Sequence, residues 1–227
     1  MKYANTVQAV FLDRPNRFVA HVRLGDGVET VHVKNTGRCR ELLVPGAEVW
    51  LTAPGTPGRK TVYDLVAVRK TDGVLFNIDS QAANRVAQEW LETRDFNRIV
   101  PEYRFGDSRI DFYMERGGDK YLMEVKGCTL ERDGIGYFPD APTERGIRHL
   151  RELAKAARTG YHASIAFVIQ MEGVTEVRPN LDTHPAFGAA LEEAEKAGVR
   201  VLFLCCRVEP DSLRVTRAGY KTDKEET

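Results

Sequence analysis

The first eighty residues alternate between apolar and polar side chains at period two, which is typical of β-strands with one buried face. In the run Phe18–Leu24 an apolar side chain recurs at every second position, and a Gly-Asp-Gly turn follows. Further strand-like runs are Val7–Leu12, Thr30–Lys34, Glu48–Thr52, Val62–Arg69 and Val74–Ile78. So many short strands suit a small closed barrel, because closure leaves no exposed edge. We predict an OB-like barrel over residues 1–80, with an SH3-like barrel as the alternative.

From Ser80 onwards the apolar spacing changes to that of helices alternating with strands. One helix is expected around Ala83–Leu91, and another from the capping residue Thr143 to Gly160. The other expected elements are strands Ile99–Phe105, Ser108–Met114, Lys120–Lys126, Ala163–Gln170 and Arg200–Arg207, and a helix near Pro185–Ala197. This order predicts an α/β domain over residues 81–227, a mixed sheet with flanking helices, and a polar, frayed tail from about Ala218.

Composition narrows the class of protein. The chain has 227 residues, 42% of them hydrophobic, which is enough for a sizeable core. Lys plus Arg and Asp plus Glu both total 33, which argues against a protein that is basic over its whole surface but allows a local basic groove. No signal-peptide pattern and no membrane-spanning apolar run is present. The cysteines lack metal-ligand spacing, so we expect buried thiols in a soluble, cytoplasmic protein.

The stretch 108–127 carries the most informative pattern. Gly117-Gly118 is a hairpin turn signal between two alternating runs, and a turn centred there pairs residues whose numbers sum to 235. The apolar face then pairs Ile110 with Val125, Phe112 with Met123 and Met114 with Tyr121. A shift by one residue would scatter these apolar side chains over both faces, so the pattern specifies the register.

The polar face of this predicted hairpin sets Asp111 directly opposite Glu124. Carboxylates about 5 Å apart repel each other unless something compensates. A divalent cation would do so, since Mg²⁺ takes one or two carboxylates plus water and phosphate oxygens, and we expect Mg²⁺ or Mn²⁺ at Asp111 and Glu124. Lys126 lies on the same face, where its ammonium can orient or help to deprotonate a water. The alternative is a lattice of salt bridges in which Arg109 and Lys126 neutralise both acids.

The pattern formed by Asp111, Glu124 and Lys126 resembles the core of PD-(D/E)xK nucleases, although Ile110 replaces the proline of that pattern. The predicted order of helix, three strands, helix and strand is the order that this core requires. The resemblance implies a restriction-endonuclease-like fold in which these three residues are catalytic. Such nucleases often draw another acid from the first helix. Glu89 is the candidate for that acid, and Glu102 is a second.

Several collinear motifs resemble the bacterial and archaeal sugar fermentation stimulation protein family. They are RPNRF at Arg14–Phe18, NTGR at Asn35–Arg38, ANR at Ala83–Arg85, SRIDF at Ser108–Phe112, EVK at Glu124–Lys126 and FPDAPTERGIRHL at Phe138–Leu150. The resemblance covers nearly the whole chain. It implies an N-terminal OB domain, a PD-(D/E)xK-like C-terminal domain, non-specific DNA binding and a regulatory role in sugar (maltose) metabolism.

Basic residues gather at turns of the predicted barrel and along the second predicted helix. Guanidinium groups bind phosphate oxygens well, and turn glycines let a backbone approach them. The candidate nucleic-acid contacts are Arg14, Arg17, Lys34, Arg38 and Arg40 in the barrel, and Arg145, Arg148 and Arg151, with Lys155, in the helix. Solvated charge clusters are the alternative. Phe18 and Tyr63 can stack on bases, although Phe18 suits the barrel core better. His149 is either catalytic or a hydrogen-bonded helix histidine.

These features favour a DNA-binding protein, largely independent of sequence and with RNA as a second ligand, that carries a nuclease-like metal site. The alternative is a Mg²⁺-dependent nuclease that cleaves phosphodiester bonds in structured DNA or RNA. A third hypothesis, a sugar-responsive regulator, lacks the support of a helix-turn-helix signature.

Overall fold

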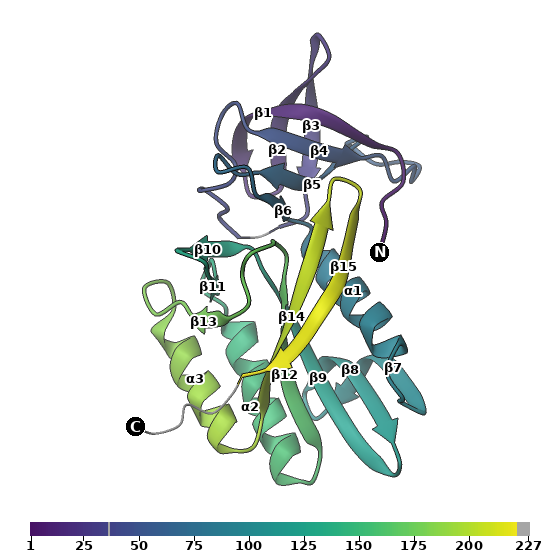
Figure 1. Cartoon of the computed structure of the whole chain (residues 1–227), viewed down its shortest axis with the longest axis vertical. Coiled ribbons are helices and arrows are strands. Elements are labelled where there is room, and N and C mark those ends of the chain that lie inside the picture. The colour runs from purple at the N-terminus through teal and green to yellow at the C-terminus, as the bar shows by residue number, and fades with distance from the viewer. Residues whose placement is uncertain (36, 222–227) are drawn as a thin grey trace.

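The computed structural model describes residues 1–35 and 37–221, and it places a β-barrel on one end of an α/β domain (Figure 1). Residue 36, in the NTGR motif, and residues 222–227 of the predicted tail lie outside the described residues. None of the described helices is long and apolar enough to cross a membrane.

Six strands form the barrel sheet, in the order β3-β2-β1-β4-β5-β6. They are β1 (Thr6–Asn16), β2 (Val19–Leu24), β3 (Gly27–Val33), β4 (Glu48–Thr52), β5 (Asp64–Arg69) and β6 (Leu75–Asn77). Parallel pairing of β3 with β5, through His32–Asp64 and Val33–Leu65, closes the first five strands into a barrel. A closed barrel of five strands is what the predicted OB fold requires. Every second residue of β2, Ala20 and Val22, is fully buried inside it, as the alternation predicts.

A second six-stranded sheet forms the centre of the C-terminal domain, in the order β15-β14-β12-β9-β8-β7. Its strands are β7 (Arg98–Phe105), β8 (Ser108–Arg116), β9 (Asp119–Cys128), β12 (His162–Ile169), β14 (Arg200–Glu209) and β15 (Ser212–Tyr220). Helix α1 (Ser80–Glu92) covers one face, and helices α2 (Glu144–Arg158) and α3 (Pro185–Lys196) cover the other (Figure 1). Asp79 caps α1 by accepting from the backbone N–H of Gln81, and Thr143 caps α2 through Gly146, as its residue type predicts.

Four strands were not predicted from the sequence. β10 (Leu130–Arg132), β11 (Ile135–Phe138) and β13 (Val177–Pro179) form a small separate sheet, and β15 is the edge strand of the large one. The start of the expected frayed tail is also different, because Ala218 pairs with Leu204 and Tyr220 pairs with Leu202. These strands are short or half exposed, so they lack a clear alternating pattern.

The central hairpin has the predicted register. Gly117 and Gly118 adopt positive φ, and β8 pairs with β9 through Phe112–Met123 and Met114–Tyr121. The predicted apolar face is wrong at one position. Ile110 packs with the cluster on the α2 face, whereas Phe112 packs with the cluster on the α1 face. The strands part beyond Phe112–Met123, and this change of face accompanies the parting.

Buried hydrogen bonds join the two domains. The Gln170 side chain, 1% exposed, donates to Asn77 Oδ1 at 2.8 Å and to the backbone oxygens of Asn77 and Asp79 at 3.1 Å each. Asp140 Oδ2 accepts from the backbone N–H of Cys39 at 2.9 Å, which ties the loop before α2 to the barrel. The barrel is therefore held in a fixed position above the end of the large sheet.

Candidate metal and nucleic-acid site

The parting of β8 and β9 creates the position of Asp111. Its Oδ2 accepts from the backbone N–H of Val125 at 2.7 Å, in place of the backbone pairing that ends at Phe112. Its Oδ1 accepts from Asn84 Nδ2 of α1 at 2.8 Å. Burial, followed by the nearby charge of Glu124, raises the pKa of Asp111. The two carboxylates are thus close enough to interact electrostatically, as the predicted hairpin requires.

Glu124 is 1% exposed and is surrounded by donors on one side only. Its Oε1 accepts from Lys126 Nζ at 2.5 Å and from His149 Nδ1 of α2. Burial alone would raise the pKa of Glu124, but the hydrogen bond from His149 and the charge of Lys126 outweigh burial and hold that pKa below its usual range. Its Oε2 is buried and has no partner among the described residues.

His149 is a hydrogen-bonded helix residue that supports Glu124. Arg145 Nε donates to His149 Nε2 at 3.3 Å, so Nε2 is the acceptor and the proton on Nδ1 points to Glu124. The ring therefore fixes one carboxylate oxygen and leaves the other free. Arg145 is one of the predicted nucleic-acid contacts, and its Nε–H group is used in the hydrogen bond to this histidine.

The donor set fits a divalent cation that keeps most of its coordination sphere for water or substrate. Two carboxylates converge here, and Oε2 of Glu124 is an unpartnered buried oxygen. No cluster of three or more His, Cys, Asp or Glu side chains suited to a metal occurs among residues 1–35 and 37–221. One or two carboxylates completed by water and phosphate oxygens is the arrangement that Mg²⁺ prefers. The residues present therefore fit Mg²⁺ or Mn²⁺.

A cleft of about 460 Å³ lies between the barrel, β9 and the loop before α2. Lys126 and Asn84, each bonded to one of the two carboxylates, line it together with Arg17 of the barrel. A second hollow of about 620 Å³ runs over the barrel and shares Arg17, Gly37, Ala141 and Pro142 with the cleft. The two hollows therefore adjoin along these residues, and we refer to them together as the groove.

Four of the predicted barrel contacts, Arg14, Arg17, Arg38 and Arg40, line this second hollow. Arg17, Arg38 and Arg40 are exposed, and their side chains make no hydrogen bond or ion pair with any described residue. Their guanidinium groups are free to bind phosphate oxygens.

Comparison with known proteins agrees with the fold and the motifs. Residues 12–78 match the family model for the SfsA N-terminal OB domain, and residues 81–212 match that for the sugar fermentation stimulation protein RE domain. The chain belongs to the sugar fermentation stimulation protein family.

Relatives within this family match along almost their whole length. The chain is 51% identical over 216 residues to the sugar fermentation stimulation protein homolog of Desulfitobacterium hafniense, covering 94% of each chain. It is 46% identical to the homolog of Clostridium beijerinckii, covering 95% of this chain and 96% of the relative. The structure of Pyrococcus furiosus SfsA, solved in complex with Ca²⁺, aligns with a TM-score of 0.82 and 31% identity over 95% of each chain.

Two of the predicted barrel contacts, Arg14 and Lys34, are bonded to groups within the protein. The Arg14 guanidinium donates to the backbone oxygens of Asn35, Gly37, Arg38 and Arg17, so it organises the turn from which Arg17 and Arg38 project. Lys34 is half buried, and its ammonium lies 3.2 Å from Asp64 and 3.0 Å from Asp79. The sequence does not reveal these bonds, because the partners of Arg14 and Lys34 are backbone groups or acids distant in the chain. Both residues therefore look like exposed cations that could contact phosphate.

Replacing Lys34 by Met is expected to lower the free energy of unfolding by about 2–3 kcal/mol, because it removes the cation shared by two buried carboxylates. Urea unfolding measures this loss. The matched control Arg40→Met changes an exposed residue and should stay within about 0.5 kcal/mol of the parent. Equal stability of the two variants would show that Lys34 is not a structural residue.

The structure does not bring Glu89 or Glu102 to the two carboxylates. Glu89 is exposed and pairs with the terminal ammonium of Met1 at 2.5 Å. It follows Asn84 by five residues, which turns it about 140° away from the face that contacts Asp111. Glu102 is exposed and pairs with Arg109 at 2.8 Å. Asn84 is the residue that α1 supplies, and the ANR motif was its only signal in the sequence.

The remaining candidates lie on the surface. Arg148 and Arg151 are exposed on α2 and have no partner among the described residues, whereas Lys155 pairs with Glu152 at 2.6 Å. Neither Arg148 nor Arg151 lines the groove. Phe18 is 52% exposed at the β1–β2 turn, so its expected core position is wrong, and the tight turn at Asn16 explains why. Tyr63 packs partly against the core.

Proposed function

We propose that this chain binds nucleic acid largely independently of sequence and holds a divalent metal ion at Asp111 and Glu124. The contact of the barrel hollow with the cleft lined by Asn84 and Lys126 carries the proposal, because a bound strand would extend from the free guanidiniums to the two side chains bonded to the acids. Arginine contacts to phosphate position a strand but do not distinguish bases. DNA is the primary ligand of the proposal and RNA the second.

The metal part of the proposal is supported by the buried, unpartnered Oε2 of Glu124 and by the relative solved with Ca²⁺. Ca²⁺ and Mg²⁺ both prefer oxygen ligands, so a site with two carboxylates suits either ion. A bound divalent ion supplies a positive charge for phosphate oxygens and lowers the pKa of a coordinated water. Asn84 and the Val125 amide would keep Asp111 oriented toward it, and His149 would keep Glu124 in place.

A second candidate function is hydrolysis of phosphodiester bonds in structured DNA or RNA. The observation that favours it is the position of Lys126. Its side chain is 16% exposed, is bonded to Glu124 and lines the cleft. An ammonium held there would bind a non-bridging phosphate oxygen or orient the attacking water. Arg17, at the junction of the two hollows, would hold the strand beside it.

Incubation with single-stranded, duplex and branched DNA and RNA, with and without Mg²⁺ or Mn²⁺, tests both functions. Binding of these nucleic acids without cleavage supports a nucleic-acid-binding function alone. Cleavage that requires metal supports a nuclease. Failure to bind any of the ligands at low salt would reject both.

Removing the two free arginines of the NTGR and RPNRF motifs is expected to weaken binding in a salt-dependent way. In Arg17→Ala/Arg38→Ala, the log–log slope of affinity against salt should flatten by about two units, since each phosphate contact accounts for about one. Fluorescence anisotropy at several salt concentrations measures it. The control pair Arg104→Ala/Arg214→Ala removes exposed arginines outside the groove and should keep the parental slope. An unchanged affinity and slope in the first variant would exclude the barrel groove.

Location and physiology complete the proposal. All four cysteines are free thiols, which suits the reducing cytoplasm that we propose as the location. The name of the relatives connects the family with sugar fermentation, and we propose that nucleic-acid binding by this chain serves the regulation of sugar use.

A further inference from the structure

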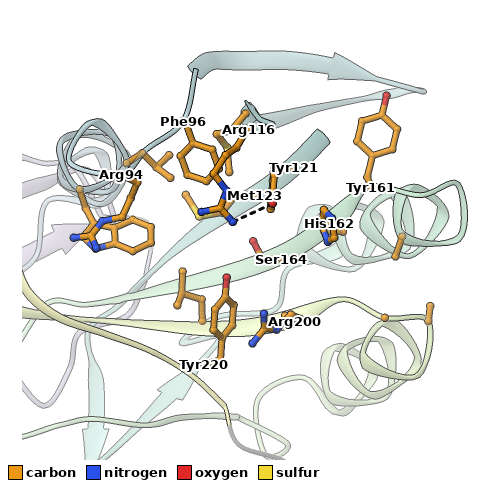
Figure 2. A pocket seen from close by; sticks show the side chains of 18 residues that line it. Arg94, Phe96, Arg116, Tyr121, Met123, Tyr161, His162, Ser164, Arg200 and Tyr220 are labelled. Atoms are coloured by element: carbon orange, nitrogen blue, oxygen red, sulfur yellow. Dashed lines mark hydrogen bonds between the residues drawn. The ribbon is translucent and has the colours of Figure 1, made fainter. Parts of the chain in front are cut away.

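A cavity of about 510 Å³, separate from the groove, lies at the end of the large sheet that is away from the barrel (Figure 2). Its floor is the part of the sheet just past the last turn of α1, where the nearly buried side chains of Met123 of β9 and Leu202 of β14 line the cavity. Trp90, in the last turn of α1, and Arg94 just beyond it close one side. The volume lies within the range of about 300–1,000 Å³ that is typical of small-molecule sites.

Three arginines, Arg94, Arg116 and Arg200, line the cavity in a chain of zero net charge. No described residue that lines it is Asp or Glu, and Arg116 pairs at 3.1 Å with Asp95, which lies just outside the lining. Figure 2 shows Arg116 and Arg200 on opposite sides of Ser164, which belongs to the floor. The guanidinium of Arg200 lies 3.4 Å from the centre of the Tyr220 ring and makes no hydrogen bond to any described residue. Its donors are therefore free for an anion, and a guanidinium binds phosphate with two parallel hydrogen bonds.

Aromatic rings line the same space. Tyr121 stacks on His162 with ring centroids 4.6 Å apart, and Phe96 packs edge-on against Tyr121 at 5.3 Å. Arg116 lies 5.3 Å from the centre of the Tyr121 ring and donates to its hydroxyl at 3.1 Å, so the ring and the cation are fixed side by side (Figure 2). Aromatic side chains bind nucleobases by stacking, at about 1–3 kcal/mol for each base.

We infer that this cavity is a binding site for a free nucleotide. The planar base would lie over the apolar floor against the aromatic rings, and the phosphate would bind Arg200 and Arg116. An apolar ligand would leave Arg200 without an anion, and an inorganic anion would make no contact of its own with the aromatic rings. Met123 faces this cavity and its chain neighbour Glu124 belongs to the metal site, so the two sites lie on opposite faces of β9.

Tryptophan emission locates the ligand, with AMP as the probe. The chain has two tryptophans, and Trp50 is buried in the barrel, so Trp50→Phe leaves Trp90 as the reporter at the cavity wall. We expect AMP to change this emission saturably. Calorimetric titration should show adenosine and inorganic phosphate binding at least about tenfold more weakly than AMP, because each lacks one half of the recognised chemistry.

Arg200→Gln is the deciding variant. It should weaken AMP binding at least about tenfold, since a hydrogen bond to a charged group is lost. Arg104→Gln, an exposed arginine of β7 outside the cavity, is the matched control and should bind AMP like the parent. Asp111→Asn should also bind AMP like the parent, which separates this site from the metal site.

Three results would overturn the inference. One is the absence of saturable AMP binding at millimolar concentration. Another is equal affinity of Arg200→Gln and Arg104→Gln. The third is Arg200-dependent binding of a 5′-phosphorylated oligonucleotide without binding of AMP, which would make the cavity a site for a strand end.

Discussion

Lys126→Met is expected to reduce metal-dependent cleavage by about a hundredfold to ten-thousandfold, which is the usual contribution of a positioned group that assists proton transfer. The ammonium of Lys126 is held at 2.5 Å from Glu124 and lines the cleft, so methionine removes both its charge and its donor from the place where a phosphate would enter. Affinity for nucleic acid should fall only modestly, with a change of about one unit in the salt slope, because a single cation near phosphate is lost. Single-turnover rates at saturating protein separate the two effects.

Lys120→Met is the matched control, since it changes the same residue type near the turn end of β9. It should cut at the parental rate. Cleavage that survives Lys126→Met would mean that a different group activates the water. If no substrate is cut by the parent, binding remains the function and the variant is compared by affinity alone.

Asp111→Asn is expected to abolish stabilisation by metal. At a metal concentration about a hundred times the dissociation constant, binding adds about 2.7 kcal/mol to the stability of the parent. For a chain of this length that corresponds to a rise in Tm of about 5–11 °C. The variant retains a similar side-chain shape but presents one carboxylate instead of two, so its Tm should rise much less. Scanning calorimetry with Mg²⁺, Mn²⁺ or no metal provides the measurement.

The control for this prediction lies on the same hairpin. Asp119→Asn removes an exposed carboxylate beside the turn, and its Tm should rise with metal as the parental Tm does. Identical metal-dependent shifts in Asp111→Asn and the parent would place the ion elsewhere.

The central hairpin was predictable because two local signals agree. The glycine pair sets the turn, and the alternation of apolar residues allows one register, which the pairing of Phe112 with Met123 confirms. The signals fail where the strands separate, because Asp111 uses its side chain to bind the Val125 amide, and strand periodicity contains no information about such a bond.

The rotation of a helix about its axis was not predictable in the same way. Glu89 and Asn84 are both polar residues of α1, and the face that meets Asp111 depends on how α1 packs over the sheet. Buried ion pairs are equally hidden. Lys34 and Asp64 are thirty residues apart, and only barrel closure by β3 and β5 brings them together.

The bonded junction between the domains sets a fixed spacing within the protein. Gln170 and Asp140 hold the barrel to the large sheet through hydrogen bonds of 2.8–3.1 Å, so the barrel turns that carry the free arginines have one position relative to the two carboxylates. A strand gripped by the barrel would meet Asp111 and Glu124 at one constant offset, counted in nucleotides from the grip. The protein would then set the number of nucleotides between the two contacts, and the ligand would bend to reach both of them.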